Sequence, residues 1–172
     1  MNATANASRI GLNYGILFGL VMIISFLLVQ FIPVITPSRM SFINLVVLGV
    51  GLVVTPLTFR KRNDGFMSYA QGLGSNAMLI LISSIISALF IYLYVKFVDD
   101  FYLLAIREDR LNALKERISE DQAIQILDGS SRFFTPEFIM VPLLASKFVL
   151  GFIFALIVVA IFAKKQPDFM DR

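Results

Sequence analysis

Lys147 is the residue whose position most suggests a chemical role, because it is a charge inside an otherwise apolar stretch, residues 141–163. A charged side chain near the middle of a bilayer costs on the order of 3 kcal/mol on insertion scales. Lys147 lies a turn or two from the end of the stretch, so its long side chain could reach the membrane interface with its ammonium group, and this is the interpretation that we favour. Alternatively, Lys147 faces neighbouring helices and pairs with Asp99 or Asp100, or holds an anionic lipid headgroup. Together with Lys96, these residues form a candidate group of interface charges.

Acidic residues are the other group that could do chemistry, and they gather after position 98. Asp99, Asp100, Glu108 and Asp109 could hold a metal ion or form an acid pair, although a solvated helix face is the commoner explanation of such a run. The chain has no cysteine and no histidine, which removes thiolate nucleophiles, the usual zinc ligands and the commonest general base. We therefore expect no metal, no cofactor and no enzymatic activity.

The composition of the chain indicates that membrane helices position these charges. Of its 172 residues, 58% are hydrophobic and only 16% are charged, against roughly a quarter charged in soluble domains. Four apolar runs approach the roughly 20 residues that a transmembrane helix needs, at about 13–35, 42–59, 75–97 and 136–163. We predict an all-α fold over residues 1–172: a single integral membrane four-helix bundle, with an extracytoplasmic amphipathic helical loop at 98–135 between the third and fourth spans.

Basic residues near the ends of the spans predict how the chain crosses the membrane. Short segments rich in lysine and arginine stay in the cytoplasm. The short segments of one side carry Arg39 alone, whereas those of the other side carry Arg9, Arg60, Lys61, Arg62, Lys164, Lys165 and Arg172. We therefore expect both termini in the cytoplasm and the charged loop outside.

The charged loop is expected to be helical and amphipathic. Its apolar residues recur at helical spacing with polar residues between them: Leu104, Leu111, Leu114 and Ile118. Ser119 followed by Gln122 has the spacing of a capping box for a second short helix, and Thr135 with Pro136 is typical of a helix start. The apolar stripe must rest on the membrane interface, on the ends of the spans or on another protein. We favour the first two for the free protein and treat the stripe as a candidate partner-facing surface.

Small residues spaced four apart mark faces where helices can approach closely in lipid. They occur in or beside three of the predicted spans: Gly11, Gly15 and Gly19, then Ser84 and Ala88, then Gly151 and Ala155. These faces either pack against another span of the same chain, which we favour, or form the contact between copies in an oligomer.

Several short motifs resemble those of one family of membrane proteins. The first span opens with Asn13, Tyr14 and Gly15, residues 65–72 (GFMSYAQG) lead into the third span, and residues 92–99 (YLYVKFVD) leave it. Together with Lys164 and Lys165, these motifs resemble a family of small bacterial membrane proteins, classed as a domain of unknown function and found mostly in Bacteroidota. The resemblance implies a four-span protein of the inner membrane and carries over no activity and no catalytic residue.

These expectations favour a function without catalysis. We expect an accessory or assembly subunit of the bacterial cytoplasmic membrane, in contact with the lipid bilayer and with another membrane protein or a second copy of itself. The alternative is a small homo-oligomeric transporter or channel. An enzyme acting on a lipid-linked substrate would need clustered charges at one interface, which only Lys96, Asp99, Asp100 and Lys147 approximate. A nucleic-acid partner is not expected, because the basic residues cluster near apolar segments.

Overall fold

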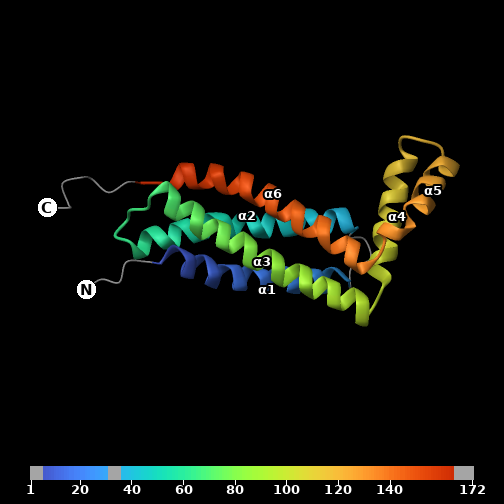
Figure 1. Ribbon diagram of the computed structural model, residues 1–172. Helices are drawn as coiled ribbons and strands as arrows, with labels where there is room; N and C mark the ends of the chain where they lie inside the picture. The colour runs from blue at the N-terminus through green and yellow to red at the C-terminus, as the bar shows by residue number, and fades with distance from the viewer. Residues whose placement is uncertain (1–5, 31–35, 165–172) are drawn as a thin grey trace.

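The fold is a bundle of four long helices with a helical hairpin at one end (Figure 1). The computed structural model describes residues 6–30 and 36–164. The long helices are α1 (Ala7–Gln30), α2 (Pro37–Arg62), α3 (Tyr69–Phe97) and α6 (Pro136–Phe162), and the hairpin consists of α4 (Phe101–Lys115) and α5 (Glu120–Gly129). A short 3-10 helix, η1 (Ser131–Phe133), leads from the hairpin to α6. The predicted all-α four-helix bundle is confirmed.

Each of the four long helices is long and apolar enough to cross a membrane. At about 1.5 Å per residue they measure roughly 36–43 Å, which exceeds the roughly 30 Å of hydrocarbon in a bilayer. α1, α2 and α3 begin one to two turns before the predicted spans, because their first turns contain polar residues that the apolar pattern excluded. The end of the first predicted span, residues 31–35, lies outside the described residues, as do Lys165 and Arg172 of the basic set.

Local capping explains where two of the long helices begin. Ser68 and Gln71 form a reciprocal capping box at the start of α3, with hydrogen bonds of 2.9 and 3.2 Å. Thr135 caps α6 directly before Pro136, as the sequence predicted. Ser119 precedes α5 in an extended conformation, but its side chain makes no capping hydrogen bond, so the predicted capping box is not formed there.

The glycine stripe of α1 lies against α3 of the same chain. A Cβ added to Gly11 would collide with the backbone oxygen of Ser75, and one added to Gly15 would lie 2.8 Å from the Cβ of Ile82. Gly19 continues the contact one turn further along α1. Any larger side chain would separate these two backbones, so the stripe serves packing within the chain.

The other small residues also face the interior of the bundle. Ser84, Ala88 and Ala155 are buried, and Gly151 of α6 lies against side chains of α2 and α3. α6 packs on these two helices and is the least buried of the four long helices. The candidate oligomer contacts are therefore used between helices of a single chain.

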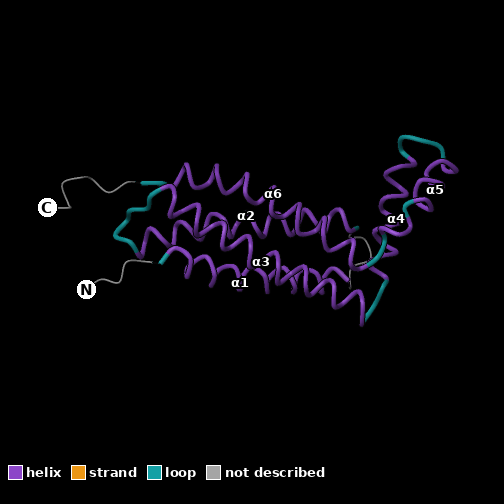
Figure 2. Tube along the Cα trace, viewed as in Figure 1, coloured by secondary structure: helices purple, strands orange, loops and turns teal. Residues whose placement is uncertain are grey.

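The hairpin crosses one end of the bundle and extends beyond it (Figure 2). Tyr102 anchors α4, because it is buried against Phe26 of α1 and in the same cluster as Met40 of α2. Burial raises the pKa of Tyr102 to about 12. Asp109, further along α4, accepts hydrogen bonds of 3.2 and 2.5 Å from the backbone N–H and the hydroxyl of Ser38 at the start of α2. These contacts hold α4 on the bundle, whereas α5 packs on α4 and lies beyond the end of the bundle.

The opposite end of the bundle is closed by a backbone bridge between the α2–α3 turn and the end of α6. The N–H of Met67 donates to the oxygen of Lys164, and the N–H of Lys164 donates to the oxygen of Met67, both at 2.8 Å. The side chain of Met67 is buried in a cluster with Ile10, Phe59 and Val159. The residues that follow α6 are thus held against the turn between α2 and α3 at this end of the bundle.

Candidate functional site

The most unusual side chain of the bundle is a lysine buried among apolar helices. Lys147 is 9% exposed and lies about 16 Å from the first residue of α6 and about 22 Å from the last. Its ammonium group donates a 2.6 Å hydrogen bond to the hydroxyl of Ser87 on α3 and lies 3.9 Å from the sulfur of Met22 on α1. The interpretation that Lys147 reaches the membrane interface is therefore wrong, since the side chain points into the bundle.

Contacts one turn away show which residues lie level with Lys147. A Cβ on Gly151, one turn after Lys147, would lie 3.0 Å from the side chain of Leu48 on α2 and 3.3 Å from that of Ile80 on α3. α2 runs parallel to α6 and α3 runs antiparallel to it (Figure 1). One turn toward the hairpin leads from Gly151 to Lys147 on α6, from Leu48 to Asn44 on α2 and from Ile80 to Ser84 on α3. These three residues are buried and lie at about the same height along the bundle. We call these residues, with the lysine's hydrogen-bond partner, the polar layer: Asn44, Ser84, Ser87 and Lys147.

Hydrogen bonding in the polar layer is incomplete. The buried Oδ1 of Asn44 and the buried Oγ of Ser84 have no hydrogen-bond partner. The ammonium group of Lys147 has three N–H groups but one strong acceptor, Ser87, because a thioether sulfur accepts only weakly. No carboxylate among the described residues forms an ion pair with this lysine.

An ionisable side chain that is buried between membrane spans without a charged partner needs a reason. Breaking or omitting one partner of a buried ion pair leaves a penalty of several kcal/mol. Ionisable residues within membrane spans are rare, and they commonly mark sites of function. The polar layer is therefore the principal candidate site of this chain.

A pocket opens at the hairpin end of the bundle. It lies between the start of α2, α4 and the start of α6, and its volume is about 270 Å³. Its lining contains both apolar and polar side chains: Pro37, Ser38, Ser41, Tyr102, Ile106, Asp109, Arg110, Pro142, Leu143 and Ser146. Ser41 lies one turn before Asn44, and Ser146 directly precedes Lys147. None of the polar-layer residues lines this pocket, and the ammonium group of Lys147 points instead to Ser87 of α3 and Met22 of α1.

The predicted interface charge Lys96 belongs to a separate contact at the end of α3. Its ammonium group pairs with Glu137 of α6 at 2.9 Å and donates a 2.7 Å hydrogen bond to the hydroxyl of Tyr92. Exposed ion pairs of this kind add little stability. Ser87, the partner of Lys147, precedes Lys96 by nine residues, or about 13 Å along α3. The two lysines therefore do not share one cluster.

The two aspartates after α3 act at the start of the hairpin. Asp99 accepts a 2.9 Å hydrogen bond from the backbone N–H of Phe101, and Asp100 precedes α4 without a capping hydrogen bond from its side chain. Neither pairs with Lys147, so the alternative in which that lysine pairs with Asp99 or Asp100 is wrong. Within the described residues, no group of three or more histidine, cysteine, aspartate or glutamate side chains is placed to hold a metal ion.

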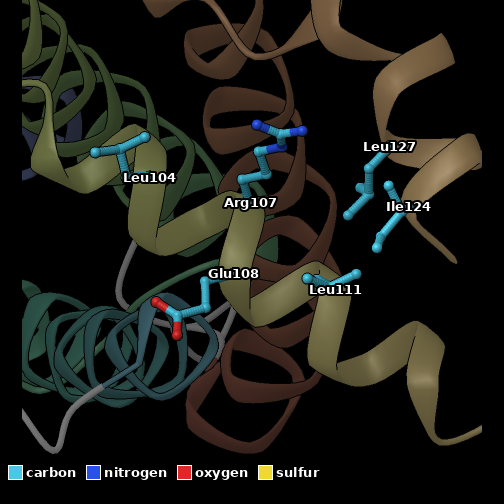
Figure 3. A pocket seen from close by; sticks show the side chains of 6 residues that line it. All are labelled: Leu104, Arg107, Glu108, Leu111, Ile124 and Leu127. Carbon is cyan, nitrogen blue, oxygen red and sulfur yellow. The ribbon is translucent and has the colours of Figure 1, made fainter. Parts of the chain in front are cut away.

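The apolar stripe of the charged loop takes part in the packing of α4 with α5. The two helices enclose an open groove of about 210 Å³ (Figure 3), lined by Leu104, Arg107, Glu108, Leu111, Ile124 and Leu127. Arg107 pairs across it with Asp128 of α5. Leu104 is 57% exposed, whereas Leu114 and Ile118, later in the stripe, are half-buried. The residue that seats α4 on the bundle is Tyr102, which the predicted stripe did not include.

The helices, the polar layer and the hairpin define a small multi-pass membrane protein with polar groups enclosed between its spans. The chain belongs to the protein family of unknown function DUF4199, whose model matches residues 13–165. This match runs from within α1 past the end of α6 and confirms the resemblance to an uncharacterised family. No curated protein and no solved structure matches the chain.

Proposed function

We propose that the protein is a non-enzymatic accessory or assembly subunit of the bacterial cytoplasmic membrane and that it binds another membrane protein through its hairpin. The observation that carries this proposal is the open apolar groove between α4 and α5. The groove lies on helices of 15 and 10 residues, which are too short to cross about 30 Å of hydrocarbon.

Exposed apolar side chains on the hairpin indicate a protein partner, whereas those on the spans are explained by contact with lipid. Lipid covers the outer faces of the long helices, so their exposed side chains need no further partner. On the hairpin, Leu104 is 57% exposed and Ile126 is 53% exposed, and Ile124 opens into the groove. Exposed apolar patches rimmed by polar residues mark sites of interaction. The charged rim of the groove, Arg107 and Glu108, would orient a partner that fills it.

The partner would bind on the extracytoplasmic side. Arg60, Lys61 and Arg62 close α2, and Lys164 follows α6, at the end of the bundle opposite the hairpin. The excess of basic residues in these short segments supports a cytoplasmic position for both termini and for the turn between α2 and α3. With this orientation the hairpin faces outward.

The test is to purify the protein from its native membrane in a gentle detergent and to identify the proteins that accompany it. Leu104→Glu places a charge in the groove at an exposed position, and Gln125→Glu adds the same charge on the exposed surface of α5. We expect the first variant to lose the accompanying protein and the second to retain it, with equal elution volumes on gel filtration. If both variants retain the same proteins, or if the unmodified chain retains none, the proposal fails.

A small transporter or channel is the second candidate, and the polar layer is the observation that favours it. Ionisable groups deep within membrane spans mark substrate and ion pathways. The small-residue faces already serve contacts within the chain, so a homo-oligomer would need other surfaces, such as the outer face of α6. Solute flux into proteoliposomes that changes with Lys147→Met would support this candidate, and equal flux in liposomes without protein would exclude it.

A further inference from the structure

We propose that the pocket at the hairpin end of the bundle binds the headgroup of a zwitterionic phospholipid of the phosphatidylethanolamine type. The carboxylate of Asp109 receives the ammonium group of the lipid, and the guanidinium of Arg110 receives the phosphate. The inference concerns a molecule that the bilayer itself supplies and rests on neither proposed function. Its basis is a pocket of about 270 Å³ that is lined by both charges and lies where the apolar part of the spans begins.

The lining of the pocket spans the boundary between the lipid headgroups and the hydrocarbon. Pro142 lies at the start of the apolar stretch 141–163, and Ser146 lies one turn, or about 6 Å, deeper along α6. On α2, Ser41 directly precedes the apolar stretch that begins at Phe42. The side chains of Pro142, Ser146 and Ser41 are exposed, and lipid is the medium that surrounds the spans at this depth. The pocket is therefore bordered by residues that meet lipid.

Two opposite charges line this pocket without pairing. Asp109 and Arg110 are neighbours in the sequence, yet neither forms an ion pair within the described residues. Both hydrogen bonds that Ser38 donates to Asp109 reach Oδ2, so the second carboxylate oxygen can accept from an ammonium group. The guanidinium of Arg110 lies over the ring of Phe134, with 5.3 Å between Cζ and the ring centroid. That contact uses the face of the guanidinium and leaves the N–H groups in its plane for a phosphate.

This combination of charges selects a zwitterion. An anionic headgroup would pair with Arg110 but would be repelled by Asp109, and a headgroup with a positive charge alone would meet the reverse situation. Phosphatidylethanolamine carries an ammonium group with N–H donors beside its phosphate, so it can satisfy both side chains. Phosphatidylcholine has the same two charges, but its methylated nitrogen has no N–H to donate to the carboxylate. Because charge-assisted hydrogen bonds are the stronger ones, the pocket should prefer phosphatidylethanolamine.

The pocket has room for the headgroup and leaves the acyl chains in the bilayer. Its volume is slightly below the roughly 300–1,000 Å³ of pockets that hold drug-sized ligands, so a whole phospholipid does not fit. Pro142 and Leu143 supply an apolar wall on the side of the hydrocarbon. The hydroxyls of Ser41 and Ser146 donate to the backbone oxygens of Pro37 and Leu143 on their own helices, at 3.0 and 3.2 Å. These two serines can therefore face the lipid without a polar group from it.

Three phospholipids with the same acyl chains test this inference, because only their headgroups differ. The full chain in detergent micelles receives increasing amounts of phosphatidylethanolamine, phosphatidylcholine or phosphatidylglycerol, and its thermal unfolding midpoint is measured. A ligand of the native state raises this midpoint. We expect phosphatidylethanolamine to reach half of its maximal shift at the lowest amount, and the other two lipids to need roughly threefold more or beyond. Phosphoethanolamine, the headgroup without acyl chains, should produce a much smaller shift.

Variants locate the site. Asp109→Asn should remove the preference for phosphatidylethanolamine over phosphatidylcholine, and Arg110→Gln should raise the amount of phosphatidylethanolamine needed by roughly threefold to tenfold. Each shift is measured against the midpoint of the same variant without lipid, so a weaker seating of α4 in Asp109→Asn does not enter the comparison. Asp121→Asn and Arg117→Gln are matched controls, because they remove exposed charges of the hairpin outside the pocket. Both controls should respond to the lipids as the unmodified chain does.

Several results would contradict the proposal. Equal responses to phosphatidylethanolamine and phosphatidylcholine would show that the carboxylate does not distinguish N–H donors, and an equal or stronger response to phosphatidylglycerol would show selection of negative charge. An equal shift with phosphoethanolamine would indicate a site for a soluble zwitterion in place of a lipid. A response to phosphatidylethanolamine that is unchanged in both Asp109→Asn and Arg110→Gln would place the lipid elsewhere, and no shift with any lipid would show that the pocket binds no headgroup. Each of these results overturns the proposal.

Discussion

Replacing Gly15 with alanine probes the close approach of α1 and α3. The new Cβ would lie 2.8 Å from the Cβ of Ile82 and 3.3 Å from the backbone oxygen of Leu79. Carbon atoms in contact prefer about 3.5–4.0 Å, so the two helices must separate by roughly 1 Å. Overpacking of this kind typically costs about 1–3 kcal/mol of the free energy of unfolding.

Gly49 supplies a matched control on α2. A Cβ added there meets no atom within 4 Å, so Gly49→Ala adds a methyl group in open space. Both substitutions remove a glycine from a helix interior and gain a similar helix propensity, about 1 kcal/mol. The difference between the two variants therefore isolates the contact of α1 with α3, and we expect Gly15→Ala to be less stable by about 1–3 kcal/mol.

Unfolding in mixed micelles of a mild detergent and dodecyl sulfate, followed by circular dichroism, measures this difference. Gly19→Ala should fall between the two variants, because its Cβ would lie 3.1 Å from Ile86. If Gly15→Ala and Gly49→Ala unfolded at the same dodecyl sulfate fraction, the contact between the two helices would be loose enough to accept a methyl group, and the reasoning would be refuted.

Two further predictions concern the orientation and the seating of the hairpin. The chain has no cysteine, so single cysteines that replace Asn63 or Asn112 can be labelled with an impermeant thiol reagent in intact spheroplasts. We expect the cysteine at position 112 to react. Labelling at position 63 would reverse the proposed orientation. Asp109→Asn should weaken the contact of α4 with Ser38 by about 1 kcal/mol, since an exposed charged hydrogen bond is partly screened. We therefore expect faster proteolysis between α4 and α5 in this variant. An unchanged cleavage rate would count against that contact.

The number of spans could be predicted from the sequence because apolar runs of sufficient length have few alternatives in a membrane. The position of Lys147 could not, because α6 is apolar on every side and offers no polar face that shows which way the lysine points. A signal existed on the neighbouring helix. Ser83, Ser84 and Ser87 in the apolar span of α3 are all buried, and such a group favours a polar contact inside the bundle.

The helical hairpin was also predicted only in part. The spacing of Leu104 and Leu111 indicates a helix, but spacing alone does not show whether its apolar side meets the spans or a neighbouring helix. In the structure α5 lines one side of the groove, while Tyr102, together with the hydrogen bonds of Asp109 to Ser38, seats α4 on the bundle. Periodicity assigns a face to a helix, whereas the partner of that face depends on the packing of the whole chain.

The backbone bridge between Met67 and Lys164 constrains the order in which the bundle is assembled during synthesis. The chain leaves the ribosome from its N-terminus, so α1 and α3 can pack through their glycine contact while the hairpin and α6 are still being made. Until then, the N–H of Met67 lacks the acceptor that Lys164 provides. The bridge therefore cannot form before Lys164 is synthesised, so a turn that precedes α3 waits for a residue that follows α6.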